Sequence, residues 1–134
     1  MPYLNWTPKL DVGVDAMNRE HQELIDRMNA FYDAAHGSSA DAIRGALDAL
    51  GSYVVEHFAH EEAYMDSVDF PGRQNHKQIH KNLLRSYSEY ADAIAETGEV
   101  PEKFLNFLKF WLTSHIKGID TKYGEHMAGV SKAS

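Results

Sequence analysis

The sequence predicts an all-α protein, an antiparallel up-down-up-down four-helix bundle with an extended N-terminal arm and a short C-terminal tail. Apolar residues recur at three- and four-residue spacing in four segments of roughly 20 residues each. Short stretches rich in Gly, Pro and Ser separate these segments, and no segment alternates as a strand does. We expect one domain over residues 1–134, with the arm at 1–15 and the tail at 124–134.

The arm and the first helix are predicted from the N-terminal third of the chain. Prolines and a glycine interrupt the first 15 residues, but Trp6 and several aliphatic residues favour an arm that packs on the domain. Asp15 is a suitable N-cap for a helix that ends near Ala35. Gly37 then provides a stop, and a serine provides the next N-cap.

Three further helices follow from the same signals. The second is predicted from about Ala40 to Met65. The third follows a turn at 70–72 and ends near Ala95. The fourth opens with Pro101 in its first turn and ends near Ile119.

Polar residues interrupt the apolar stripes of these helices. His57 and Glu61 lie one turn apart on the stripe of the second helix, where aliphatic residues are usual. His76 and His80 have the same spacing early in the third helix, and His21 lies early in the first. In an up-down bundle these positions share one end, and a late position in the fourth helix shares it too. The pattern therefore predicts convergence of these side chains at one level.

The fourth helix supplies His115 at that level, and Asp120 follows it by five residues. On a regular α-helix, this spacing separates two side chains by about 140°. Both can face the same site only if the helix ends or bulges between them. Gly118 makes such an irregularity easy to form.

The convergence predicts a metal site. One histidine on an apolar stripe is ordinarily a buried, hydrogen-bonded core residue, but five histidines and two carboxylates together are costly to bury without a partner. The chain has no cysteine, so the ligands are nitrogen and oxygen. Because these ligands are too many for one ion, two ions bridged by the carboxylates are expected, with three histidines on one, two on the other and one coordination position left open. The predicted ligands are His21, His57, Glu61, His76, His80, His115 and Asp120.

Composition excludes several other classes of protein. The formal charge is -7, from 20 acidic and 13 basic residues without an evident basic cluster, which argues against a nucleic-acid partner or an anionic membrane surface. The first residues show no signal-peptide pattern, and polar residues break the longest apolar-rich segment, so neither secretion nor membrane insertion is expected. We expect a cytoplasmic protein, and a monomer because no apolar stripe faces outward.

These residues resemble the hemerythrin family, and specifically its single-domain bacterial members. The seven predicted ligands in their order and spacing carry the resemblance, together with Trp6 and the segment 13–15. The resemblance implies two non-haem iron ions, oxo- or hydroxo-bridged, one held by His76, His80 and His115 and the other by His21 and His57. It also implies that dioxygen binds at the second iron, inside an apolar pocket. The residues that match that pocket are Leu24, Phe58, Trp111, Leu112 and Ile116. The chain departs from many relatives at Asn18, where they have Asp; this residue is not an expected ligand.

Reversible dioxygen binding without an enzymatic activity is the expected function, for storage, transport or delivery to an oxygen-consuming enzyme. Two electrons and the proton of a bridging hydroxide would pass to dioxygen together, which leaves the charge of the buried site unchanged. A di-iron oxidase of the ferritin type usually has more carboxylates than imidazoles, and here imidazoles predominate. An oxygen or redox sensor and a zinc or manganese carrier are two further candidate functions. His36, His60 and His126 are expected to be exposed.

Overall fold

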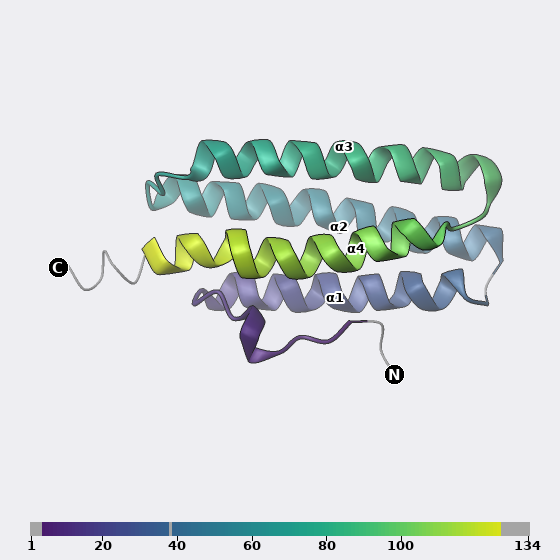
Figure 1. Ribbon diagram of the computed structural model, residues 1–134, viewed down its shortest axis with the longest axis horizontal. Coiled ribbons are helices and arrows are strands. Elements are labelled where there is room, and N and C mark those ends of the chain that lie inside the picture. Colours follow the sequence, from purple (N-terminus) through teal and green to yellow (C-terminus); the bar gives the residue numbers. More distant parts are fainter. Residues whose placement is uncertain (1–3, 38, 127–134) are drawn as a thin grey trace.

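The computed structural model describes residues 4–37 and 39–126 of the chain. Four long helices lie side by side: α1 (Asp15–Ala35), α2 (Ala40–Ser67), α3 (Arg73–Thr97) and α4 (Glu102–His115) (Figure 1). Two short elements accompany them, the 3-10 helix η1 (Pro8–Leu10) and the π-helix η2 (Ile116–Asp120). No strand is present within the described ranges. The predicted fold class, an antiparallel four-helix bundle with an N-terminal arm, is confirmed.

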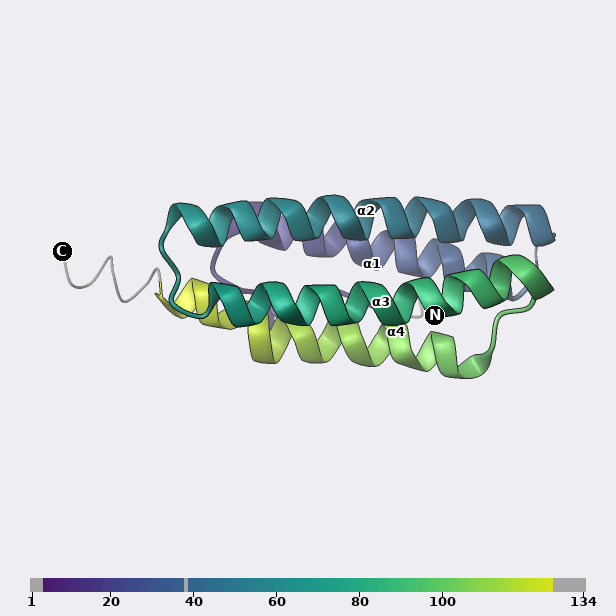
Figure 2. The same cartoon turned by 90° about the horizontal axis from the view of Figure 1, so that it is seen from above.

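The helices alternate in direction along the bundle. Figure 2 shows that the connection between α2 and α3 lies at the same end as the start of α1 and the end of η2. The connections from α1 to α2 and from α3 to α4 lie at the opposite end. Residues early in α1 and α3 and late in α2 and α4 therefore share one level. No helix in the described part of the chain has the length and apolar character needed to cross a membrane.

Helix starts follow the capping signals only in part. The side-chain oxygen of Ser39 accepts a hydrogen bond from the Ala42 amide at 3.2 Å, so the predicted cap of α2 is confirmed. The predicted cap at Asp15 is wrong, because Val14 is the extended N-cap residue and Asp15 is already helical. A carboxylate in the first turn still interacts favourably with the positive end of the helix dipole.

Helix ends differ from the prediction by a few residues. Helices α2 and α3 each extend slightly beyond the expected ends, to Ser67 and Thr97. The last α-helical residue of α4 is His115 rather than Ile119, and after η2 the backbone is helical again through residues 121–126. Residues 124–126, which were predicted as the start of the tail, are therefore helical. The remainder of the tail, 127–134, and residues 1–3 of the arm lie outside the described residues.

The apolar core runs along the bundle, and it alone fills the half away from the α2–α3 connection. Its fully buried side chains include Met28, Phe31, Leu50, Ile94, Phe104 and Leu108. On α2, Phe58 and Met65 are buried as well, whereas Tyr64 is half-buried. This apolar half supplies packing energy that does not depend on the polar residues at the other end.

Two asparagines hold the N-terminal arm against α1. The amide side chain of Asn29 accepts a hydrogen bond from the Leu4 amide at 2.7 Å and donates one to the Leu4 carbonyl at 2.8 Å. Asn18 accepts from the Val12 amide at 3.0 Å and donates to Asp11 Oδ1 at 2.8 Å. An aspartate at position 18 has no N–H to donate to a second carboxylate. Asn18 thus fixes the arm.

An apolar groove of about 320 Å³ lies between α3 and α4. The sequence pattern did not predict this groove. The Phe110 side chain beside it is 73% exposed. The groove combines residues from two helices, so neither helix alone shows an outward apolar stripe. Its lining residues are Ile79, Leu83, Phe107, Phe110, Trp111, Ser114, His115 and Ile119.

The arm also passes very close to the helical segment that follows η2. A Cβ atom at Gly124 would overlap the carbonyl oxygen of Val12, which is backbone and cannot rotate away. Only glycine allows this approach. Gly45, an exposed glycine within α2, has open space around its Cα.

We predict that Gly124→Ala destabilises the protein by about 1–3 kcal/mol, because the arm must shift to relieve the overlap. Gly45→Ala is the matched control and should stabilise the protein by about 0.5–1 kcal/mol, since alanine favours the helix. Urea denaturation followed by circular dichroism measures both values. Equal stability of the two variants would contradict the close packing of the arm.

Candidate metal centre

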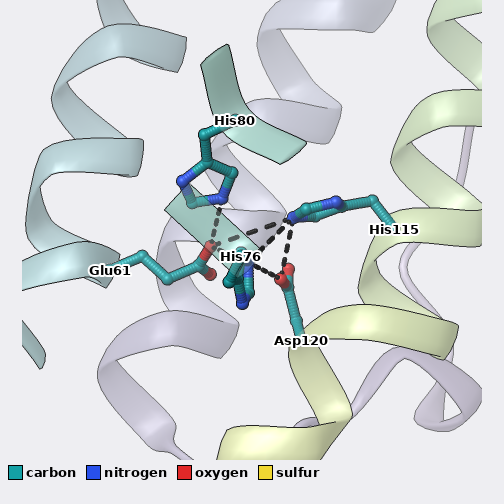
Figure 3. Close-up of side chains that lie close together, drawn as sticks. All are labelled: Glu61, His76, His80, His115 and Asp120. Atoms are coloured by element: carbon teal, nitrogen blue, oxygen red, sulfur yellow. Dashed lines mark hydrogen bonds and ion pairs between the residues drawn. The ribbon is translucent and has the colours of Figure 1, made fainter. Parts of the chain in front are cut away.

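Seven polar side chains converge at the bundle end that holds the α2–α3 connection. They come from every long helix and from η2, and each is at most 7% exposed. The cluster consists of His21 on α1, His57 and Glu61 on α2, His76 and His80 on α3, His115 on α4 and Asp120 on η2. The structure thus brings together all seven residues predicted as ligands. Figure 3 shows five of them pointing toward a common centre.

Glu61 divides its two carboxylate oxygens between two groups of histidines. Its Oε1 lies 3.0 Å from His80 Nε2 and 3.2 Å from His76 Nε2. Its Oε2 lies 3.4 Å from both His21 Nε2 and His57 Nε2. One carboxylate therefore faces two sets of imidazole nitrogens, as a bridging ligand does.

Asp120 divides its oxygens in the same way. Its Oδ1 lies 2.9 Å from His115 Nε2 and 3.0 Å from His76 Nε2, whereas Oδ2 lies 3.1 Å from His21 Nε2. The two carboxylates thus separate the histidines into a group of three and a group of two. His76, His80 and His115 form the first group, and His21 and His57 form the second.

The π-helical turn η2 orients Asp120 toward the cluster. The amide of Thr121 donates to the carbonyl of Ile116, five residues earlier, so this turn contains one residue more than an α-helical turn. His115 and Asp120 consequently face the same side despite their five-residue spacing. The predicted irregularity between them is confirmed, with Gly118 at its centre.

Several buried cluster atoms have no hydrogen bond, an arrangement that fits a bound cation. Within the described residues, Glu61 Oε1, both Asp120 oxygens and His80 Nε2 are buried and make no hydrogen bond. His76 Nε2 and His115 Nε2 also face each other at 3.2 Å. Buried polar atoms without partners are rare in proteins, and a positive ion would satisfy these oxygens and nitrogens together. The donor set therefore fits two metal ions that share Glu61 and Asp120.

Without metal, the carboxylates hold protons on the surrounding imidazoles. Burial alone would lower the pKa of His57, but hydrogen bonds to Glu20 and Glu61 outweigh it and raise the pKa to about 9. Burial likewise lowers the pKa of His115, and the nearby carboxylates of Asp120 and Glu61 raise it to about 9. Burial raises the pKa of Glu61 and Asp120, yet the neighbouring imidazoles bring both below their usual values. The metal-free cluster is thus held together by ion pairs.

These shifts predict a pH-dependent stability of the metal-free protein. The folded-state pKa values of His57 and His115 are raised from 6.5 to about 9. Their contribution is therefore fully present below pH 6.5 and is lost as the pH rises through 9. Urea denaturation of chelator-treated protein should give an unfolding free energy that falls between pH 6.5 and 9. His115→Gln, with one titrating group fewer, should show a shallower fall, and a flat profile for the unsubstituted protein would contradict the ion pairs.

Tyr123 contacts the seven-residue cluster, and the sequence pattern did not predict this contact. Its hydroxyl is buried and donates a hydrogen bond to Glu61 Oε2 at 2.9 Å. Burial and the nearby negative charges of Glu61 and Asp120 raise the pKa of Tyr123, so the hydroxyl keeps its proton. Tyr123 therefore holds Glu61 in its divided orientation. In the sequence it is only the last residue before the expected tail.

The five apolar residues that match the family's dioxygen pocket are all buried, and they lie on helical elements that also carry cluster residues. Leu24, Phe58, Trp111, Leu112 and Ile116 are each at most 6% exposed. The Phe58 ring stacks on the His80 ring at 3.7 Å between centroids and meets the Trp111 ring edge-on at 5.9 Å. These contacts place aromatic carbon directly beside the histidine cluster. Their role as a pocket wall stays a prediction.

The other three histidines lie outside the cluster. His36 and His60 are exposed, as expected. The same expectation is wrong for His126, which is half-buried. Its Nε2 donates to the Val68 carbonyl at 3.2 Å, and its ring lies 5.6 Å from the Phe70 ring. These contacts depend on the helical segment that follows η2, where the sequence pattern predicts a tail.

The fold and the cluster together define a helical-bundle protein with a buried cluster of residues suited to metal binding. A family profile described as the hemerythrin HHE cation binding domain matches residues 12–126. Because this match covers most of the chain, the protein belongs to the hemerythrin family.

Similar proteins are known from bacteria and from a eukaryote. A bacteriohemerythrin of Pseudomonas paraeruginosa is 29% identical over 92% of this chain and 80% of its own length. A hemerythrin-like protein of Naegleria gruberi is 34% identical, covering 89% of each chain. The crystal structure of a wild-type hemerythrin superposes with a TM-score of 0.84 at 29% identity, covering 91% of this chain and 95% of the other. The family resemblance read from the ligand spacing is confirmed.

Proposed function

We propose that this protein binds dioxygen reversibly at a pair of iron ions. The observation that supports the proposal is the division of the cluster into three histidines on one side and two on the other, with two carboxylates shared between them. If both ions have the same coordination number, the ion with fewer histidines keeps an open position. A bound di-iron pair supplies two electrons that dioxygen can take up and return.

The chain's residues would hold these ions as two unequal groups. His76, His80 and His115 would hold one ion, and His21 and His57 the other. Glu61 and Asp120 would each contribute one oxygen to either side, as their divided contacts suggest. Imidazole suits iron, zinc and copper, and a nitrogen-rich set favours the lower oxidation state more than a carboxylate-rich set does. These preferences support a binding protein over an oxidase.

The apolar surroundings favour reversibility. Leu24, Leu112 and Ile116 are nearly inaccessible to solvent, and Phe58 covers one face of His80. A dry wall keeps water and anions away from a reactive ligand and slows side reactions. We propose that this wall protects bound dioxygen during storage or delivery to an oxygen-consuming enzyme.

An oxygenation cycle tests the proposed function. We predict that protein loaded anaerobically with Fe(II) binds about two irons per chain, the number that the two overlapping ligand groups can hold. A visible charge-transfer band should appear in air and disappear on deoxygenation over repeated cycles, measured by absorption spectroscopy. Immediate conversion to a diferric form with released peroxide would favour an oxidase. Preferential retention of zinc or manganese, measured by metal analysis, would favour a carrier of those ions.

The proposed wall makes a separate prediction about lifetime. Leu112→Ala should speed the autoxidation of the oxygenated protein several-fold, because truncation opens space for water beside the cluster. Leu50→Ala is the matched control, since it removes the same atoms from the apolar half of the bundle. Its autoxidation rate should stay near that of the unsubstituted protein. The autoxidation rates are measured from the decay of the visible band. Equal rates for the two variants would contradict the proposed role of the apolar wall.

A further inference from the structure

Two carboxylates outside the cluster bind the outer nitrogens of two cluster histidines. Glu20 Oε1 on α1 lies 2.7 Å from His57 Nδ1 on α2. Glu62 Oε2 on α2 lies 2.9 Å from His80 Nδ1 on α3. Each contact joins two different helices. His57 belongs to the group of two histidines and His80 to the group of three, so each group has one such contact.

Two other cluster histidines have no carboxylate on their outer nitrogen. Within the described residues, the Nδ1 atoms of His21 and His76 are buried and make no hydrogen bond. The anionic contacts are therefore selective for one histidine in each group. Ion pairs between two exposed side chains contribute little, whereas each of these contacts involves a buried imidazole and a carboxylate that is itself largely covered.

A hydrogen bond from Nδ1–H to a carboxylate has two effects on an imidazole. It fixes the tautomer that leaves the Nε2 lone pair free, and it makes that nitrogen a stronger donor to a metal. In both His57 and His80, the Nε2 atom is the one that faces the cluster carboxylates. The outer carboxylates thus act on the correct side of the ring.

Glu20 has a further contact that Glu62 lacks in the described structure. Its second oxygen accepts a hydrogen bond from His60 Nδ1 at 3.0 Å. His60 is 52% exposed, whereas Glu20 is 21% exposed and lies between the two rings. The chain His57–Glu20–His60 therefore runs from the cluster to the surface on the side of the two-histidine group.

We propose that Glu20 and Glu62 are positioning residues that set the ring orientation and donor strength of His57 and His80. His60 in turn restrains Glu20. As far as it concerns iron, this inference rests on the proposed function, but the orientation of the rings applies to any divalent ion in the same site. Glu20 contacts a histidine of the two-histidine group, so it would tune the ion proposed to have the open position.

Metal binding by single variants tests the positioning role. Co(II) affinity, measured by competition with a coloured chelator, should fall about 10- to 100-fold in Glu20→Ala and in Glu62→Ala. Glu56→Ala is the matched control, because Glu56 is an exposed acid beside His57 on the same helix. Its Co(II) affinity should stay close to that of the unsubstituted protein. If all three variants bind Co(II) equally, the proposal fails.

A second pair of variants separates geometry from charge. Glu20→Gln keeps an oxygen that can accept from His57 but removes the negative charge. It should retain most of the Co(II) affinity, while the midpoint potential of the iron-loaded protein rises, as measured by spectroelectrochemistry without dioxygen. His60→Ala should weaken Co(II) binding less than Glu20→Ala does. An unchanged potential in Glu20→Gln would overturn the claim about donor strength.

Separate measurements distinguish the positioning role from effects on folding and on dioxygen binding. Loss of stability of metal-free Glu20→Ala in urea, with Co(II) affinity unchanged, would show a merely structural contact and overturn the proposal. The cobalt and potential measurements need no dioxygen. If the variants behave as predicted but the unsubstituted protein fails the oxygenation cycle, the proposed function fails and the positioning role stands.

Discussion

The burial of two negative charges in the middle of a helical bundle is the constraint on which this structure depends. Glu61 and Asp120 are fully buried, and removing a carboxylate from water costs several kcal/mol unless charge or hydrogen bonds compensate for it. Five imidazoles surround these carboxylates, and in the metal-free protein protonated His57 and His115 provide compensating charge, as their raised pKa values indicate. Each long helix contributes at least one of these imidazoles. The alternating direction of the helices and their common level are therefore required by the electrostatics of the site as well as by the packing of the apolar half.

The sequence was sufficient to predict the fold and the seven residues proposed as ligands. A histidine or carboxylate on an apolar stripe is conspicuous because that position must face the interior, and His57 with Glu61 made the clearest pair. The spacing of His115 and Asp120 even required the irregular turn, since a regular α-helix would have turned one of them away. Periodicity determines which side of a helix a residue occupies. The cluster residues were predictable because each of them occupies the inward-facing side.

Residues that act between helices were not predictable in this way. Glu20 and Glu62 lie beside the stripes and resemble ordinary surface acids in sequence, so only the packing of neighbouring helices shows that they reach buried imidazoles. Tyr123 was not predicted because it lies beyond the expected end of the fourth helix, and the helical backbone that resumes after η2 places it beside Glu61. The apolar groove beside Phe110 was not predictable from the sequence either, because it forms only where two helices pack together. Distances across helices depend on tertiary packing, which single-helix patterns do not contain.

The wide turn η2 has a consequence for how the length of this chain can change. Inserting one residue into an α-helix rotates everything beyond it by about 100°. A π-helical turn absorbs one extra residue locally, so the segment that follows keeps its facing. Tyr123 lies beyond the turn and still reaches Glu61. Loss of a single codon at this point of the gene would convert the turn to a regular α-helical one and is therefore tolerated geometrically in a way that the same change within α2 or α3 is not.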